Sequence, residues 1–389
     1  MDRFTVVVLV RKDCLPDPRV FKESRTLSSR YRVVIVDTHD TPVPDGLKLR
    51  SLEVDRVLAP PGGGIWRHLL FKWSAVQKSV AQKPDVVHAN DLDTLFEGCV
   101  VKWLTGARLV FDAHELFNDT YIPNVWTEHV KRAYWRFLAW MLIPRADLVI
   151  TVNPLIASHL QKTHGLKRLP TVIYNAPETR PRRRVCDEVI RFYRSHPGRK
   201  FLVYTGALTP SRLPSFELLL DALSILGRRP LVVLVGIGSP GSLVQRVRRL
   251  GLEKDVVFLP QKPVPVMLDY LRFADAGFVA LTANCLNNKL GAPNKLFDYI
   301  QFGLPVLAFD LPFVSRVLRR FGVGVVSRPD ASSLSRCIRR LFGRRFKKSE
   351  FKAAQGAFNW PRESRKLLSA YSALLQERRA PRSRAVHSR

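Results

Sequence analysis

Uninterrupted runs of β-branched and aliphatic residues recur along the chain. The first half contains VVVLV at 6–10, VVIV at 33–36 and LVIT at 148–151. A strand with one face in water alternates apolar and polar residues, so these runs predict strands that are buried on both faces, as in parallel sheets. Helix-like segments lie between the runs. This order predicts an α/β fold with doubly wound sheets.

The same alternation occurs twice. In the first series we expect strands at 4–10, 32–37, 85–88, 108–112, 147–152 and 171–174. The expected helices between them lie at 18–29, 66–82, 92–104 and 128–143. In the second series the expected strands lie at 201–206, 231–236, 256–259, 276–281 and 305–309. The sequence therefore predicts two Rossmann-like domains in tandem that face a central cleft, which is the default active site.

A charged, proline-containing segment separates the two series. We expect an N-terminal domain at 1–178, a basic linker at 179–200 and a C-terminal domain at 201–357. Residues 376–389 include five arginines and little that is apolar, which predicts a disordered tail.

The charge of the chain indicates an anionic partner. Lys and Arg number 63 against 33 Asp and Glu, so the net charge is +30. Nucleic acid, a membrane surface and a phosphorylated substrate are the partner classes that such an excess favours. The hydrophobic content of 46% excludes global disorder.

The sequence also favours a cytoplasmic protein. The apolar stretch from Phe4 to Val10 is followed by charged residues at 11–13, so we interpret it as a buried strand and not as a signal peptide. No run of about 18 apolar residues predicts a membrane span. The five cysteines are far apart and form no C-x-x-C motif, which fits a reducing compartment and predicts no metal site.

Two helix starts in the second series are suited to phosphate. Gly206 ends a predicted strand and lets a ligand approach the backbone, and Arg212 lies near the start of the next helix. Pro293 and Asn294 open another helix, and Asp298 one turn later could accept hydrogen bonds from ribose hydroxyls. The alternatives are a surface arginine at 212 and a solvated helix face at 298.

The segment 286–309 resembles the donor site of retaining GT-B glycosyltransferases of group 1, also called family four. Asp298 stands in place of the second glutamate of their E-x7-E pattern, while Leu290 replaces the first. The stretch 205–223 is similar to their phosphate-binding segment, with Arg212 as one expected cation and Ala207 in place of the other. The resemblance implies that Lys295 compensates and that the backbone near Gln261 contacts the nucleobase.

Residues of the first half resemble the same family. Asp17-Pro18-Arg19-Val20 is similar to its D-x-R-V motif, and Asn175 matches the asparagine at the end of its first domain. The resemblance implies that His114 touches the donor sugar near its reacting carbon. Glu115 is a weaker active-site candidate, on the acceptor side. His88 and Asp91 follow a strand, so we expect them either to shape the acceptor site with Arg19 or to be structural.

The resemblance implies a metal-independent reaction without a cofactor. Asp91-Leu92-Asp93 imitates a D-x-D metal motif, but we expect Asp93 only to cap the helix 94–104. The implied enzyme is a retaining hexosyltransferase that uses a UDP- or GDP-sugar and a sugar or lipid-linked acceptor of cell-envelope or glycolipid synthesis. Residues 358–375 resemble the closing helix that returns to the first domain.

Two basic, aromatic-rich segments, 66–83 and 125–145, indicate where the remaining charge could act. Such helices can lie on the anionic inner leaflet of the cell membrane, or their apolar stripes can simply pack on the sheet. Two further alternatives are a catalytically inactive GT-B homologue and a basic nucleic-acid-binding protein. No helix-turn-helix, zinc finger or RNP-like motif supports specific nucleic-acid binding.

Overall fold

The computed structural model describes residues 3–11, 14, 17–39, 52–58, 65–116, 119, 126–178, 184–236 and 241–379. The chain forms two compact units. The first comprises residues 1–118, 122–174 and 361–389, and the second comprises residues 119–121 and 175–360. The glycines at 62–64 and the tail from 380 onward lie outside the described residues.

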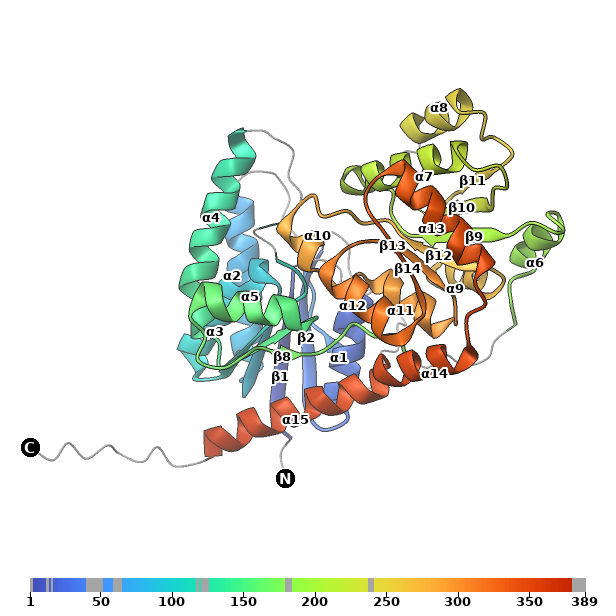
Figure 1. The fold of residues 1–389 in the computed structure, drawn as a ribbon. Helices are drawn as coiled ribbons and strands as arrows, with labels where there is room; N and C mark the ends of the chain where they lie inside the picture. The colour runs from blue at the N-terminus through green and yellow to red at the C-terminus, as the bar shows by residue number, and fades with distance from the viewer. Residues whose placement is uncertain are drawn as a thin grey trace, which may run out of the picture. The chain divides into compact units, whose positions relative to one another are not determined.

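The first unit contains a parallel sheet (Figure 1). Its strands are β1 (Thr5–Val10), β2 (Arg32–His39), β3 (Leu52–Val54), β4 (Val57–Leu58), β5 (Val86–Asn90), β6 (Arg108–Ala113), β7 (Leu148–Thr151) and β8 (Thr171–Val172). They are ordered β3-β2-β1-β5-β6-β7-β8, and β4 also pairs with β2. The strand order reverses between β1 and β5, where ligands of such sheets bind beyond the strand ends.

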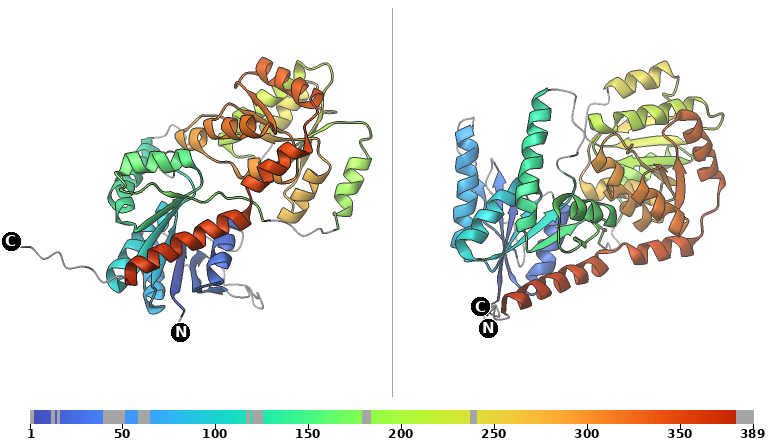
Figure 2. Two further views of the ribbon diagram at one scale, coloured as in Figure 1. Left: turned by 60° about the horizontal axis from the view of Figure 1, so that its bottom comes forward. Right: turned by 60° about the vertical axis from the view of Figure 1, so that its left-hand side comes forward.

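Helices cover both faces of this sheet. They are α1 (Pro18–Ser28), α2 (Ile65–Ala81), α3 (Leu92–Thr105), α4 (Trp126–Leu142), α5 (Pro154–His164) and α15 (Trp360–Arg379). Figure 2 shows α2 and α4 as long parallel rods beside the strands of this unit. The helix α3 lies very close to the sheet, because a Cβ on its Gly98 would come within 2.9 Å of Leu109 and 3.2 Å of Ala89.

The second unit contains another parallel sheet, ordered β11-β10-β9-β12-β13-β14. The strands are β9 (Phe201–Thr205), β10 (Leu231–Val235), β11 (Val256–Leu259), β12 (Ala276–Val279), β13 (Val306–Phe309) and β14 (Gly324–Ser327). Its order reverses between β9 and β12. Aromatic rings build part of its core. Phe278 of β12 contacts Phe309 of β13 and Phe216 of the helix at 213–224, both edge to face.

The helices of the second unit alternate with these strands. They are α6 (Asp187–Arg194), α7 (Leu213–Ser224), α8 (Gly241–Arg249), α9 (Val264–Asp269), α10 (Leu286–Leu290), α11 (Asn294–Gln301), α12 (Pro312–Phe321), α13 (Ala331–Gly343) and α14 (Lys348–Ala357). The predicted fold class, with two doubly wound parallel sheets, is therefore confirmed. Part of the segment predicted as a linker is helical and bonded to this unit, because the Tyr193 hydroxyl donates to the Tyr270 carbonyl at 2.6 Å.

The sequence did not predict every element or boundary. The strands β3 and β4 and the helix α10 are short, so they carry too little periodicity to be recognised. The strand β14 is as long as β11, but the glycines at 322 and 324 interrupt its apolar run. The helix α15 runs to Arg379 and so includes residues 376–379, which we expected in the disordered tail. The side chain of Glu377 pairs with Arg168 at 2.9 Å, which gives this last turn a partner in the first unit.

Candidate functional site

Two turns of the chain pack closely against each other at the carboxyl ends of β9 and β10. Gly206 follows β9 with φ at +141°, a conformation that side chains disfavour. A Cβ on Gly236, which follows β10, would lie 1.7 Å from the carbonyl oxygen of Gly206. Both positions therefore require glycine, and the two turns pack closely beside the point between β9 and β12 where the strand order reverses.

Two cations lie beside Gly206. Arg212 ends the 3-10 turn η3 (Pro210–Arg212), and its guanidinium donates to the Ala207 carbonyl at 3.2 Å. A Cβ on Gly206 would meet the Lys295 side chain at 3.4 Å. The structure thus brings together the predicted donor residues Gly206, Arg212 and Lys295. Two positive side chains beside a glycine turn are suited to bind a diphosphate.

The helix α11 supplies the rest of this group. Lys295 in its first turn pairs with Asp298 at 3.1 Å. Pro293 is the N-cap and makes no side-chain cap. The N–H of Leu296 donates to the Pro293 carbonyl at 3.0 Å, so the N–H groups of Asn294 and Lys295 are those that an anion could use. The side-chain oxygen of Asn294 accepts a hydrogen bond from Asn175 at 3.1 Å.

Gln261 lies apart from these contacts in sequence and structure. It is exposed in the segment after β11, and no described contact joins it to Gly206 or α11. Its assignment to the nucleobase stays a prediction.

A buried ionic network occupies the corresponding end of the first sheet. Asp112, near the end of β6, receives two hydrogen bonds from Arg19 of α1, at 2.9 and 2.7 Å. Asp17 caps α1 and accepts from the backbone N–H groups of Arg19 and Val20. This cap fixes the first turn of α1, and with it the place of Arg19 under the strand ends.

His114 lies between two carboxylates of this network. Its Nε2 is 3.0 Å from Asp112 Oδ2, and its Nδ1 is 3.3 Å from Asp91 Oδ2. Burial alone would lower the pKa of His114, but Asp91 and Asp112 outweigh it and raise the pKa to about 10. The side chain remains 17% exposed, so a ligand can still reach it.

The three carboxyl groups of this network, those of Asp112, Glu23 and Asp91, differ in pKa. Burial would raise the pKa of Asp112, yet Arg19 and His114 hold it well below the usual range. Burial raises the pKa of Glu23 to about 8, and Arg19 offsets this only in part. Burial likewise raises the pKa of Asp91 to about 7, against the effect of His114.

His88 and Arg19 are not where an acceptor could touch them. Each residue is only about 1% exposed, because His88 lies in the middle of β5 and Arg19, in the first turn of α1, is bonded to the buried Asp112. The Nδ1 of His88 is 2.5 Å from the hydroxyl of Tyr371 on α15. Burial lowers the pKa of His88, so the ring is neutral. The expectation that they line the acceptor site is corrected: both are structural.

The expected N-cap of α3 is corrected, and the exposure of Glu115 fits its expected place in the site. The residue before α3 is Asp91 and not Asp93, which lies in the first turn. Asp91 is held there by the backbone N–H of His114, which donates to it at 3.0 Å. Glu115 is exposed beside His114, as a ligand contact would require.

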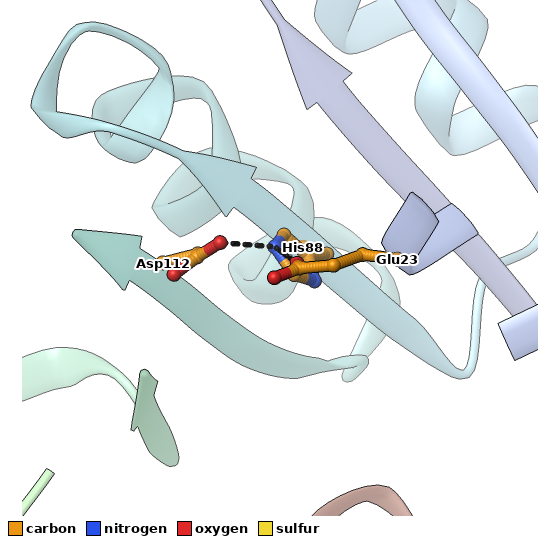
Figure 3. A group of neighbouring side chains, drawn as sticks. All are labelled: Glu23, His88 and Asp112. Carbon is orange, nitrogen blue, oxygen red and sulfur yellow. Dashed lines mark ion pairs between the residues drawn. The ribbon is translucent and has the colours of Figure 1, made fainter. Parts of the chain in front are cut away.

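Glu23, His88 and Asp112 form the one group of potential metal ligands found in the described part of the chain. Figure 3 shows their side chains pointing toward one another, Glu23 from α1 and the other two from neighbouring strands. Arg19 already lies 3.0 Å from Glu23 and 2.7 Å from Asp112. Because one guanidinium already contacts both carboxyl groups, the arrangement is an ionic network and does not suit a metal ion.

Sequence reasoning missed Glu23 and Tyr371 as members of this network. Glu23 lies four residues after Arg19 on one helix face, a spacing that could have indicated the pair. Tyr371 carries no local signal, since its partner His88 is 283 residues away.

The fold and the two polar strand ends define a GT-B glycosyltransferase. The model of Glycosyltransferase Family 4 matches residues 19–180, and the model of Glycosyl transferases group 1 matches residues 199–344. The chain therefore belongs to the group 1 glycosyltransferases. No curated protein sequence matches it significantly.

Several solved structures share its fold at low sequence identity. Sucrose-phosphate synthase from Thermosynechococcus elongatus has a TM-score of 0.74 and 16% identity, covering 96% of this chain and 100% of that one. Anabaena Alr3699/HepE in complex with UDP and glucose has a TM-score of 0.70 and 17% identity, covering 95% and 100%. The lipopolysaccharide outer core galactosyltransferase WaaB has a TM-score of 0.66 and 14% identity, covering 95% and 99%.

Proposed function

We propose that the protein transfers a hexose from a UDP- or GDP-sugar to an acceptor hydroxyl with retention of the anomeric configuration. The observation that carries this proposal is the placement of Arg212 and Lys295 at the Gly206 turn. The fold of a HepE complex with UDP-glucose, similar to this chain at a TM-score of 0.68, gives further support. The nucleotide-sugar is a substrate, and no resident cofactor is proposed.

The proposed reaction needs no group beyond the donor and the acceptor to account for every bond and proton. The bond between the anomeric carbon and the β-phosphate oxygen breaks, and the acceptor oxygen bonds to the same face of that carbon. The departing phosphate takes the proton of the acceptor hydroxyl. Negative charge therefore grows on the diphosphate, where Arg212, Lys295 and the N-terminus of α11 can stabilise it without a metal.

Release of nucleoside diphosphate from a panel of UDP-, GDP- and ADP-sugars tests this proposal. Arg212→Ala should lower turnover by about 100-fold or more, the scale for loss of one charge-stabilising group. Arg228→Ala is the matched control, because Arg228 is exposed in the same unit and far from α11 in sequence. Equal turnover of the two variants would refute the phosphate assignment, and donor binding without turnover would indicate an inactive homologue.

We also propose that the enzyme works peripherally at the anionic inner leaflet, on a lipid-linked acceptor of envelope or glycolipid synthesis. No helix in the described part of the chain is long and apolar enough to span a bilayer. The helices α2, α3 and α4 instead expose large apolar side chains, which we name the apolar face: Leu69, Leu70, Trp73, Phe96, Trp103, Tyr134, Phe137 and Trp140.

The charges around the apolar face support an anionic partner. The helices α2 and α4 carry three Lys or Arg residues each, and their single acidic residue is Glu128. The helix α3 carries Lys102 against Asp93 and Glu97, so the three helices together keep a positive excess. Trp140 is 64% exposed and Trp103 is 82% exposed, which is unusual for side chains of this size. Aromatic residues beside basic ones are typical of helices that lie in a membrane interface.

Sedimentation with vesicles that contain anionic lipid, compared with vesicles of neutral lipid alone, tests the membrane proposal. The double variant Trp73→Ser with Trp140→Ser should lose most binding at low salt. Ile225→Ser, an exposed apolar residue of the second unit, should bind like the wild type. Vesicle binding that does not depend on anionic lipid would refute the anionic leaflet as the partner. A preference for an added oligonucleotide would refute the membrane and favour nucleic acid.

A further inference from the structure

A strongly basic segment of the second unit lies outside the site described above. Residues 311–350 contain eleven Lys or Arg residues against two acidic ones, Asp330 and Glu350. These forty residues thus carry a net charge of +9, out of +30 for the whole chain. Neither the Gly206 turn nor the apolar face includes any of them.

Three helix ends bring part of this segment together. Arg344, the C-cap of α13, donates to the carbonyl of Gly322, the C-cap of α12, at 3.4 Å. The same guanidinium lies 3.7 Å from Glu350 in the first turn of α14. The ends of α12 and α13 and the start of α14 therefore meet at one corner of the unit. We name the six exposed cations at these ends the basic corner: Arg320, Arg340, Arg344, Arg345, Lys347 and Lys348.

The basic corner lies at the opposite edge of the sheet from the donor site. The strands of this sheet are parallel, so their amino ends share one edge and their carboxyl ends share the other. Gly322 precedes β14, whereas Gly206 follows β9. The two edges are about 13 Å apart for a strand of this length, at roughly 3.3 Å per residue, which is more than an arginine side chain can span. A ligand at the Gly206 turn is therefore not the partner of these cations.

The protein itself balances little of this charge. Within the described part of the chain, the one ion pair of the basic corner joins Arg344 to Glu350. Cations elsewhere along the same edge are closely paired, since Asp255 lies 2.7 Å from Arg199 and 3.2 Å from Arg229. A high arginine content alone does not explain the corner, because carboxylates accompany the cations at that other place.

Helix dipoles explain only some of the basic corner. Arg320 and Arg340 lie in the last turns of α12 and α13, where the dipole favours a cation. Lys347 and Lys348 are the N-cap and the first residue of α14, where the positive end of the dipole disfavours them. Lysines in that place cost stability unless an anion from outside the chain lies beside them. The two lysines therefore indicate an external anion.

The basic corner offers charge without an apolar anchor or an open aromatic ring. None of the large apolar side chains exposed in the described part of the chain lies between 311 and 357. The guanidinium of Arg320 lies 5.4 Å from the centre of the Phe321 ring, and that of Arg344 lies 4.8 Å from the centre of the Phe346 ring. Because a cation lies over each ring, the corner does not offer the stacking surface that single-stranded nucleic acids use.

We propose that the basic corner binds the phosphate headgroups of an anionic leaflet by charge alone, without insertion. This second contact with the leaflet rests on the proposed function, which places the enzyme there. Clustered lysines and arginines are attracted to such a surface within a Debye length. The contact differs from that of the apolar face in one measurable property: salt screens binding by charge, whereas it does not weaken the burial of apolar side chains.

Sedimentation with anionic vesicles tests the proposal by comparing two triple variants. The test variant removes three cations of the corner: Arg345→Ala, Lys347→Ala and Lys348→Ala. The matched control removes three exposed cations beside β11, the strand at the other side of the same sheet: Arg248→Ala, Arg249→Ala and Lys254→Ala. The test variant should bind about 100-fold more weakly than the wild type at low salt, since each Lys or Arg near the surface contributes about fivefold. The control should bind within a few-fold of the wild type, and high salt should remove the difference between the two variants.

The outcomes separate the basic corner from the apolar face and from the donor site. Equal vesicle binding by the two triple variants would overturn the proposal, while the variant of Trp73 and Trp140 still decides the role of the apolar face. A wild type that binds no anionic vesicles would overturn both contacts. UDP and GDP binding should be unchanged in the test variant, which shows that the donor site is intact.

Two further measurements distinguish other roles for the same cations. Loss of oligonucleotide binding in the test variant, with vesicle binding unchanged, would assign the corner to nucleic acid and overturn the leaflet as its partner. The test variant should unfold at the same temperature as the wild type or at a higher one, because it removes cations from the start of α14. A lower unfolding temperature would show that these cations serve the fold, and so contradict the proposal.

Discussion

The hydroxyl of Tyr371 lies 2.5 Å from Nδ1 of His88, although 283 residues separate them in the sequence. The contact joins the last helix, α15, to the centre of the first sheet. A second buried contact supports it, since the carboxylate of Glu363 accepts the backbone N–H of Tyr174 at 3.0 Å. The helix α15 is thus part of the core of the first unit and covers His88, which lies next to Asp112 in the ionic network.

Tyr371→Phe should destabilise the first unit. The change removes a hydroxyl from a fully buried site and leaves Nδ1 of His88 without its partner, which costs roughly 1–3 kcal/mol. Urea unfolding measures the effect. Tyr134→Phe is the control, because Tyr134 is exposed on α4. Equal stability of the two variants would show that the buried bond contributes nothing.

Glu23→Gln should change how stability depends on pH. Burial raises the pKa of Glu23 from 4.5 to about 8 in the folded protein. A raised pKa contributes stability that is fully present below pH 4.5 and is lost as the pH rises toward 8. Glutamine keeps the neutral form, so the variant should gain about 1 kcal/mol or more relative to the wild type between pH 5 and pH 8.5.

Thermal or urea unfolding at several pH values checks this sign. Glu53→Gln offers a control, since its side chain is exposed and paired with Arg32 at the surface. Wild-type and Glu23→Gln curves that run parallel across the window would mean that Glu23 is ionised in the folded protein.

Gly236→Ala should damage the donor site from within the sheet. The new methyl group would lie 1.7 Å from the Gly206 carbonyl oxygen, so the two turns must separate. Such overpacking costs about 1–3 kcal/mol and should also weaken nucleotide binding. Gly227→Ala is the matched control, because no atom lies within 4 Å of the added methyl group. Unchanged stability and binding in Gly236→Ala would contradict the close approach.

The repeated strands and helices could be predicted because their signals are local. An apolar run such as 231–235 can only be buried on both faces, and the predicted boundaries of β10 and β11 lie within one residue of the observed ones. The two-residue β4 has no such signal and pairs only because β2 lies beside it. The spacing of apolar residues alone left open which face of α4 packs on the unit. Packing decides this, and it leaves Phe137 and Trp140 exposed.

The candidate site could be predicted only where its residues belong to one local motif. Gly206, Arg212 and Lys295 each mark a strand end or helix start, so their meeting follows from the topology of the sheet. The burial of His88 could not be read in the same way, because a helix at the far end of the chain covers it. For the same reason the expectation of an acceptor contact there was wrong.

The central claim is that the Gly206 turn and α11 bind the diphosphate group of a nucleotide-sugar. Calorimetric measurement of UDP and GDP binding tests it. The wild type should bind at least one of the two nucleotides. Arg212→Ala and Lys295→Ala should each weaken that binding by roughly 10- to 100-fold, since a charge-assisted hydrogen bond is worth about 1.5–3 kcal/mol. Arg228→Ala should bind as the wild type does. A dissociation constant unchanged in both site variants would contradict the account.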